Sequence, residues 1–250
     1  MQYLKMERED EVVQITIDRE DKLNALSLDV MDEFIAVLDE LEKDSSKVVI
    51  ITGAGQKAFS AGADIDYMSK IGPVEAERYA IRGHEVLNKI EKLEKPVIAS
   101  INGYALGGGC ELALSCDVRF ASTNAQLGQP EVTLGICPGW GGTQRLLRIV
   151  GPARAKDLIF SGRRINAEEA LSMGLVNKVF SSEQLLSEAK SYARHIAKNS
   201  SFAVGISKML VNKGMDASLD TGLKLEIYSW SLCFSTKERE DRMNVFLRKK

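Results

Sequence analysis

The stretch GYALGGGCELALSCD, residues 103–117, places three glycines directly before Cys110 and Glu111. The run that follows Glu111 is apolar and is typical of a helix. A glutamate is almost never fully buried unless it has a partner or a chemical role. Glycines also let a backbone approach a ligand closely. This stretch is therefore the first candidate for a chemical site.

Backbone amides give the glycine-rich turn a possible use. The start of the following helix leaves N–H groups without partners and directs the positive end of the helix dipole outward. Such amides can stabilise negative charge that develops on a carbonyl oxygen. A second turn, FSAGADI at residues 59–65, could supply another N–H. Two converging amides would form an oxyanion hole; the alternative is that both turns are only tight connections.

Standard glycine motifs do not account for the stretch. Gly103 and Gly108 have the spacing of a P-loop, but Gly109 stands where the lysine is required. Leu112 occupies the third glycine position of a dinucleotide-binding motif. The sequence also has no G-x-S-x-G nucleophile elbow, so covalent acyl transfer is disfavoured.

Alternating strand and helix patterns surround these turns. Strand patterns occupy residues 12–17 and 118–122 and the starts of KVVIITGAG and KPVIASINGYALGGG. Helical patterns follow Ser27, a predicted N-cap, and Pro73, which suits a first helical turn. This order predicts an α/β core. From about Glu183 the pattern is helical only, so we expect a core at residues 1–195 and a helical oligomerisation region at 196–250.

Composition narrows the functional classes. The 250 residues are 44% hydrophobic and 27% charged, as in an ordinary globular protein, and the net charge is −2. That charge argues against general attraction to nucleic acid or to an acidic membrane. The start of the chain lacks a signal-peptide pattern and no apolar run approaches the ~20 residues of a membrane span. We therefore expect a cytoplasmic protein.

Metal-binding patterns are also missing from the sequence. The four cysteines have no metal-ligand spacing, and we interpret them as small buried hydrophobic residues. His84 and His195 lie far apart in charged helical patterns, which favours surface or structural roles. We expect no metal site.

Four long blocks carry a resemblance to a known family. They are AFSAGADI, INGYALGGGCELALSCD, QPEVTLGICPGWGGTQRL and SGRRINAEEALSMGLVNKVF. In their order and spacing they resemble the enoyl-CoA hydratase (crotonase) family, and the resemblance covers nearly the whole chain. It implies the crotonase, ClpP-like spiral of ββα units. It also implies a C-terminal helical region that makes homotrimers, often paired into hexamers.

The resemblance also implies a substrate and a set of site residues. The substrate is a coenzyme A thioester, whose oxygen the amides of Ala63 and Gly108 would hold. Glu131 would be the acid that protonates Cα, and Glu111 the base that activates water. Coenzyme A is part of the substrate, and no separate cofactor is expected.

Addition of water to an α,β-unsaturated thioester explains why such residues are needed. The reaction requires a base near the water, a proton for Cα and a site for the enolate charge. Relatives with other chemistry often lack one glutamate. The presence of both favours a hydratase over the alternative, a double-bond isomerase. A non-catalytic or RNA-binding relative is a further alternative, which the charge and both glutamates disfavour.

Further positions resemble those that line coenzyme A in relatives. They are Lys22, Leu23, Ala61, Ala63, Asp64 and Ile65, with Phe246 and Lys249 expected to complete the pocket of a neighbouring subunit. Trp140 departs from the family by being bulkier than the usual small residue. If Trp140 faces the acyl tunnel, short chains of roughly four carbons would be preferred; if it packs in the core, nothing follows.

Overall fold

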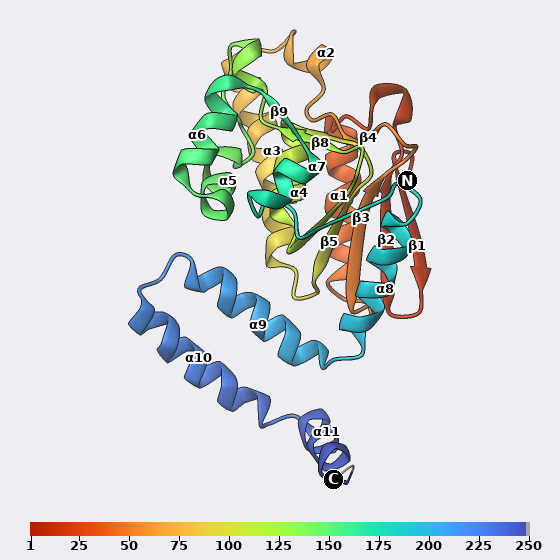
Figure 1. The fold of residues 1–250 in the computed structure, drawn as a ribbon, viewed down its shortest axis with the longest axis vertical. Helices are drawn as coiled ribbons and strands as arrows, with labels where there is room; N and C mark the ends of the chain where they lie inside the picture. Colours follow the sequence, from red (N-terminus) through yellow and green to blue (C-terminus); the bar gives the residue numbers. More distant parts are fainter. Residues whose placement is uncertain (249–250) are drawn as a thin grey trace.

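Two sheets form the centre of the computed structural model, which describes residues 1–248 (Figure 1). The larger sheet has the order β1-β2-β3-β5-β7-β10, and only β1 and β2 pair antiparallel. Its strands are β1 (Leu4–Glu9), β2 (Val12–Ile17), β3 (Val48–Gly53), β5 (Val97–Ile101), β7 (Val118–Ser122) and β10 (Lys178–Phe180). The smaller sheet consists of β4 (Ala58–Ser60), β6 (Tyr104–Leu106), β8 (Gln126–Gly128) and β9 (Arg164–Asn166).

The chain crosses between the two sheets in a repeating order. Strands β3, β5 and β7 of the larger sheet are each followed by a strand of the smaller sheet and then by helices. The helices of the first part of the chain are α1 (Leu28–Leu41), α2 (Ile65–Met68), α3 (Pro73–Lys92), α4 (Gly108–Ser115), α5 (Gly142–Val150), α6 (Pro152–Ser161) and α7 (Ala167–Ser172). Two short 3-10 helices are η1 (Glu20–Lys22) and η2 (Glu131–Leu134). This order agrees with the predicted spiral of ββα units.

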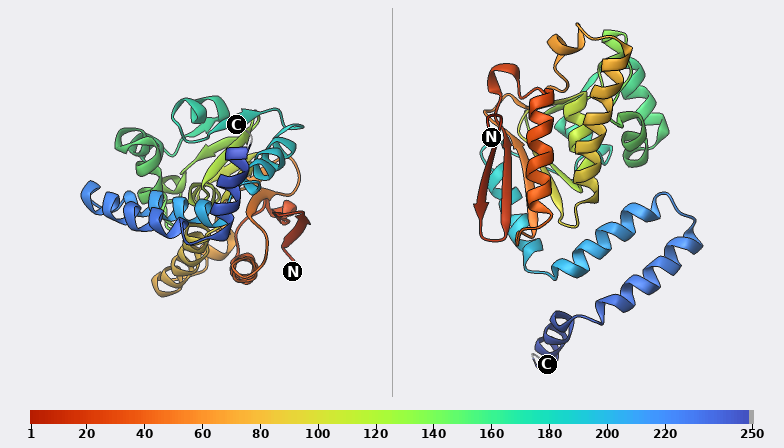
Figure 2. Two further views of the ribbon diagram at one scale, coloured as in Figure 1. Left: turned by 90° about the horizontal axis from the view of Figure 1, so that it is seen from below. Right: turned by 180° about the vertical axis from the view of Figure 1, so that it is seen from behind.

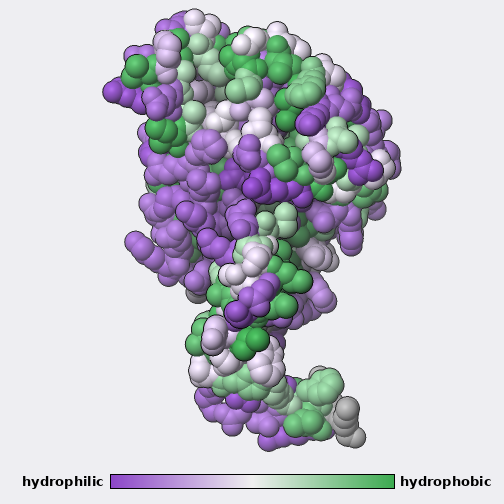
Figure 3. Space-filling model, turned by 90° about the vertical axis from the view of Figure 1, so that its left-hand side faces the viewer, coloured by the Kyte–Doolittle hydropathy of each residue, from purple (hydrophilic) through white to green (hydrophobic). Residues whose placement is uncertain are grey.

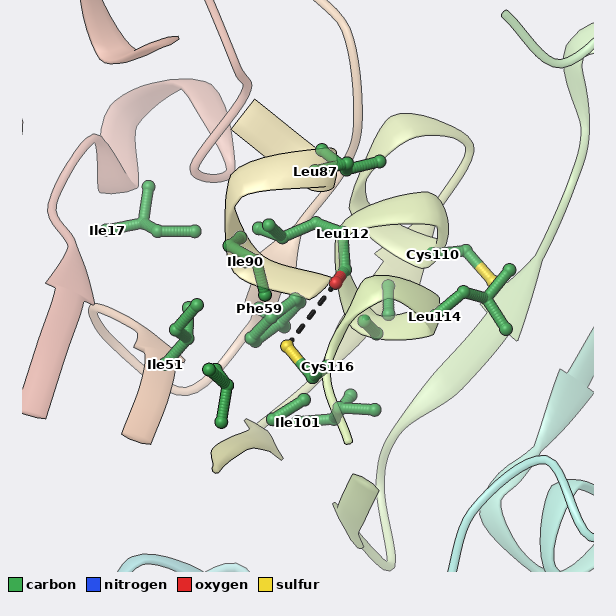
Figure 4. Close-up of a cluster of buried hydrophobic side chains, with 14 of the residues drawn as sticks. Ile17, Ile51, Phe59, Leu87, Ile90, Ile101, Cys110, Leu112, Leu114 and Cys116 are labelled. Carbon is green, nitrogen blue, oxygen red and sulfur yellow. Dashed lines mark hydrogen bonds between the residues drawn. The ribbon is translucent and has the colours of Figure 1, made fainter. Parts of the chain in front are cut away.

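Hydrophobic side chains on both faces of the larger sheet are buried. In β3, Val49 and Ile51 belong to the main core, whereas Val48 and Ile50 point into a second cluster on the opposite face. Successive side chains of a strand alternate between faces, so a strand covered on both sides reads as a continuous apolar run. Figure 4 shows part of the main core, where residues of α3 and α4 meet the sheet. This packing fixes α4, and with it the glycine-rich turn.

Most predicted elements are confirmed, with some additions. The strand at residues 12–17 has the predicted bounds, Ser27 accepts the amide of Val30 as an N-cap, and Pro73 begins α3. The periodicity did not reveal β4, β6 and β8, because three residues are too few to show a period. Together with β9, which was not predicted either, these short strands make the smaller sheet. Strand β1 was also not predicted, because its residues, LKMERE, are mostly polar.

The C-terminal part is helical, as predicted from about residue 183. Its helices are α8 (Leu185–Ala197), α9 (Ser201–Gly214), α10 (Leu219–Cys233) and α11 (Lys237–Arg248). Helix α8 covers the second face of the larger sheet. Helix α9 runs along the end of the core, where Lys208 donates to the carbonyls of Ile90 and Lys95, while α10 and α11 project away from it (Figure 2). The predicted division at 195/196 falls near the end of α8, and it stays a prediction. None of the helices within residues 1–248 is long and apolar enough to cross a membrane.

Candidate active site

A cavity of about 480 Å³ brings most of the predicted site residues together. It lies between the α2–α3 region, the start of α4, and the segments around residues 130–140. The predicted residues in its wall are Ala61, Ala63, Ile65, Gly108, Glu111, Glu131 and Trp140. Most other lining residues are apolar, among them Met68, Ala76 and Leu134. A mainly apolar cleft with a few convergent polar groups is typical of a small-molecule site.

The amides of Ala63 and Gly108 are neighbours in this cavity. A Cβ placed on Gly108 would lie 3.3 Å from the Ala63 nitrogen, and one placed on Gly62 would lie 3.0 Å from the Gly108 nitrogen. The residues before the two donors, Gly62 and Gly107, have φ of 101° and 52°, which glycine adopts readily. Neither amide has an acceptor within residues 1–248. The pair can therefore receive an anionic oxygen.

Tyr79 of α3 supports the Ala63 turn. Its hydroxyl donates to the Leu26 carbonyl over 2.6 Å and accepts the Asp64 amide over 3.1 Å. The Leu26 amide in turn donates to the Gly62 carbonyl. Tyr79 was not predicted as a site residue, since nothing in a helical pattern distinguishes it from an ordinary core residue. Its hydroxyl fixes the turn from which the Ala63 amide points.

Glu111 lies in the first turn of α4 and is only 2% exposed. Its Oε1 accepts hydrogen bonds from the amides of Trp140 and Gly142, each over 2.7 Å. Burial raises the pKa of Glu111, whereas these two amides and the charge of Arg145 oppose that rise. The two amides favour the ionised form, but burial outweighs them, so the pKa of Glu111 is raised on balance, and a raised pKa strengthens a base. The arrangement suits a base.

Glu131 begins η2 and faces the glycine turn at Gly107. Burial, together with the charge of Glu111, raises the pKa of Glu131 to about 7, although its own amide opposes the rise. The side-chain amide of Gln129 can donate to both Glu131 oxygens, at 2.9 and 3.2 Å. A primary amide can donate a hydrogen bond from its nitrogen to a carboxylate, or accept one with its oxygen from a carboxylic acid. Glu131 is thus suited to holding a proton near neutral pH.

Trp140 both lines the cavity and packs in the core. It is 4% exposed, and its ring meets Tyr79 edge-on with a centroid distance of 5.2 Å. The indole fits only because residue 83 is a glycine, since a Cβ there would lie 2.4 Å from the ring. Trp140 is therefore a core residue whose ring also lines the cavity. Its contact with the acyl chain stays a prediction.

Other predicted coenzyme A residues lie outside the cavity wall. Lys22 and Leu23 are in and just after η1, and the Leu23 carbonyl accepts the Ala61 amide. Asp64 pairs with Arg19 over 2.8 Å and accepts the Tyr67 amide, as a loop-holding aspartate would. Phe246 is in α11, away from the cavity of its own chain. Lys249 lies outside the described residues. The roles of these residues stay predictions.

Metal ligands do not gather in the described part of the chain. Within residues 1–248, no three His, Cys, Asp or Glu side chains are grouped as a metal site requires. The polar groups of the cavity are instead two carboxyl groups and a pair of amides. Their types suit proton transfer and stabilisation of an oxyanion.

Comparison with known proteins identifies the family. The family model described as enoyl-CoA hydratase/isomerase matches residues 7–250. The chain belongs to this family. It is 49% identical over 246 residues to the short-chain-enoyl-CoA hydratase of Clostridium acetobutylicum, covering 98% of this chain and 94% of the relative. It is 45% identical over 246 residues to the crotonyl-CoA hydratase of Syntrophomonas wolfei, covering 98% and 95%.

Solved structures of enoyl-CoA hydratases share the fold. The enoyl-CoA hydratase of Bacillus anthracis superposes with a TM-score of 0.97 at 40% identity, covering 99% of this chain and 97% of the other. An enoyl-CoA hydratase of Thermoplasma volcanium gives a TM-score of 0.93 at 34% identity, covering 98% and 97%. The predicted crotonase fold is confirmed, and so is the resemblance on which it was based.

Proposed function

We propose that the protein is a hydro-lyase that adds water reversibly to a short-chain trans-2-enoyl-CoA and forms a 3-hydroxyacyl-CoA. The observation that carries the proposal is the placement of two differently held carboxyl groups and two unpaired amides around one cavity. Relatives over nearly the full chain are named for this reaction, which supports the same assignment here. The mechanism uses only groups of this chain, and coenzyme A enters as part of the substrate.

The thioester oxygen is held by the amides of Ala63 and Gly108 in the proposed mechanism. Glu111 removes a proton from water as the water oxygen bonds to Cβ. The electron pair of the double bond moves toward the thioester, and the resulting enolate oxygen is stabilised by the two amides. Glu131 then gives its proton to Cα. Exchange of protons with solvent restores both carboxyl groups.

The environments of the two glutamates support different roles. Oε1 of Glu111 is occupied by two amides, which favour the carboxylate and leave Oε2 for water. Glu131 has a pKa raised to about 7, chiefly by burial, so the acid form is available near neutral pH. Pairs of titratable groups with contrasting environments are how enzymes separate acid and base functions. Because the two groups interact, the pair titrates as a unit.

Trp140 supports the preference for short acyl chains. Its ring is wedged between Gly83 and Tyr79, so it cannot turn aside without disturbing α3. A longer acyl chain would need the volume that the indole fills. We propose that substrates of roughly four carbons fit beside the indole.

Self-association into trimers, alone or paired as hexamers, is also part of the proposal. Helix α10 exposes large apolar side chains in a single chain, and Figure 3 shows hydrophobic surface on the projecting C-terminal part. They include Leu219, Leu223, Ile227, Tyr228 and Trp230. An exposed patch of this kind is typical of an interface. Phe246, in α11, would then reach a neighbouring coenzyme A site, and the assembly would reside in the cytoplasm.

Two assays on the same preparation test the proposed reaction. Hydration is followed as loss of the enoyl-thioester absorbance of crotonyl-CoA, with 3-hydroxybutyryl-CoA identified as the product. Isomerisation is followed with a 3-enoyl-CoA, which an isomerase would convert to the 2-enoyl isomer. We expect rapid hydration and much slower isomerisation. Isomerisation without hydration would replace the proposal by its alternative.

A further inference from the structure

The turn that holds Glu111 is itself held by Arg145 of α5. The amides of Trp140 and Gly142 donate to Glu111 Oε1, so the orientation of this carboxyl group depends on the position of residues 140–142. The carbonyl of Trp140 accepts a hydrogen bond from Arg145 Nη1 over 2.9 Å. The peptide groups on either side of Trp140 therefore connect Arg145 to the carboxylate.

Arg145 is anchored to a different helix from the one that carries Glu111. Its Nη2 donates to Asn88 Oδ1 and to Glu91 Oε2 of α3, each over 2.8 Å, and its Nε also donates to Glu91 Oε2 over 3.2 Å. The side chain of Arg145 is 12% exposed. A planar guanidinium with several fixed donors can hold three acceptors in one geometry, which an ammonium group does less well. The turn at 140–142 is thus fastened to α3.

We propose that Arg145 is a positioning residue for hydration: it fixes the 140–142 turn against α3 and so fixes which Glu111 oxygen faces the reacting water. The inference rests on the proposed function, in which Glu111 activates water. Both amide bonds go to Oε1, so the turn determines the direction of Oε2. A shift of the turn would rotate the carboxyl group directly, because both amides that hold Glu111 belong to the turn. The amides that hold the thioester oxygen come from other segments, and Gly108 meets the turn only through the Trp140 ring.

In addition to the hydrogen bond that Arg145 makes to the turn, its positive charge affects Glu111. It favours the ionised form of Glu111 against the effect of burial, which raises the pKa of that carboxyl group. Glu91 pairs with the guanidinium, and His84 also lies beside it, with its pKa lowered by burial and by the Arg145 charge. The negative charge of Glu91 thus offsets part of the guanidinium charge. The lowered pKa of His84 favours the neutral form of its ring.

Arg148 provides a matched control on the same helix. It lies three residues after Arg145, but its guanidinium bonds to Gln144 and to Asp216 and its side chain is 41% exposed. Replacement of each arginine by methionine removes one positive charge and keeps a long side chain. Only Arg145→Met removes the hydrogen bond to the Trp140 carbonyl. Arg145→Lys keeps the positive charge, but an ammonium group cannot donate to all three acceptors in the geometry of the guanidinium.

The experiment measures kcat and KM for crotonyl-CoA and the Kd for the product, 3-hydroxybutyryl-CoA. For Arg145→Met we expect kcat to fall about 10- to 100-fold, because small displacements of catalytic groups have effects of this size. KM and Kd should change much less than kcat, by no more than about threefold, since the amides of Ala63 and Gly108 that hold the thioester are not part of the turn. Arg145→Lys should lie between wild type and Arg145→Met, and Arg148→Met should match wild type.

Two results would overturn the assignment of Arg145. One is a kcat for Arg145→Met within twofold of wild type; the other is an equal loss in Arg148→Met. If Arg145→Met fails to fold, as judged by its unfolding transition and its mass in solution, Arg145→Lys carries the test: wild-type kcat there would overturn the proposal. Absence of hydration by the wild-type protein would instead refute the proposed function, which the same assay detects first.

Discussion

The backbone amide of Trp140 donates to Oε1 of Glu111 over 2.7 Å. The residue whose ring limits the cavity thus also holds, through its main chain, the carboxylate proposed to activate water. Side chain and backbone of Trp140 carry separable functions. Replacement of the side chain should therefore alter substrate length without removing the support of Glu111.

Glu111→Gln and Glu131→Gln test the two-carboxylate mechanism. Each change should lower kcat for crotonyl-CoA hydration about 10²- to 10⁴-fold, because a positioned general acid or base contributes that much. A glutamine at 111 keeps an oxygen that can accept the amides of Trp140 and Gly142. The measurement is the rate of absorbance loss. Full activity in either variant would show that the mechanism is wrong.

The pH dependence should reflect the raised pKa of Glu131. The proposed acid must be protonated, so kcat/KM for hydration should fall as the pH rises above about 7. A single ionisation gives a tenfold fall per pH unit. At low pH the rate should also fall, because protonation of Glu111 removes the base. A rate that stays constant from pH 6 to pH 9 would contradict the assignment of Glu131.

Trp140→Ala should lengthen the acyl chains that the cavity accepts. Removal of the indole opens the space against Gly83, so the ratio of kcat/KM for C8 to that for C4 should rise by at least tenfold. This corresponds to about 1.4 kcal/mol in the transition state. Loss of a buried tryptophan also lowers the free energy of unfolding by about 3–5 kcal/mol. An unchanged ratio in a folded variant would remove Trp140 as the length determinant.

Gly83→Ala offers a complementary change from the opposite side of the indole. The new Cβ would come within 2.4 Å of the Trp140 ring and force it to move. Because the ring faces the cavity, displacement toward that space should raise KM for crotonyl-CoA. The measurement is a chain-length series of steady-state rates. Wild-type KM values throughout would indicate that α3 yields instead.

Ile227→Asp tests self-association through α10. Ile227 is 64% exposed in one chain, and a carboxylate buried in an interface without a partner is strongly unfavourable. We expect wild type to have a mass of three or six chains and the variant to shift toward the 27.5 kDa of one chain. Light scattering after gel filtration measures both. A wild-type mass of one chain would contradict the proposed trimer.

Local patterns in the sequence were enough for most of the long elements, although not for the mostly polar β1. The alternation at residues 12–17, the cap at Ser27 and Pro73 depend on neighbours along the chain, and each was found where predicted. Short strands of the smaller sheet carry no such signal. They form because the large sheet and α4 bring them together, which only the tertiary structure decides.

For the site, too, some properties follow from the sequence and others from the packing. The carboxyl groups and turns to consider could be recognised before the fold was known, because Ala63, Gly108, Glu111 and Glu131 stand in blocks that resemble a known family. The tertiary structure decided their states, because the amides that hold Glu111 come from residues 29 and 31 positions away and burial sets the pKa of Glu131. The contacts of Tyr79 and Arg145 likewise join distant segments. Such contacts have no local periodicity, since they depend on how helices and turns pack.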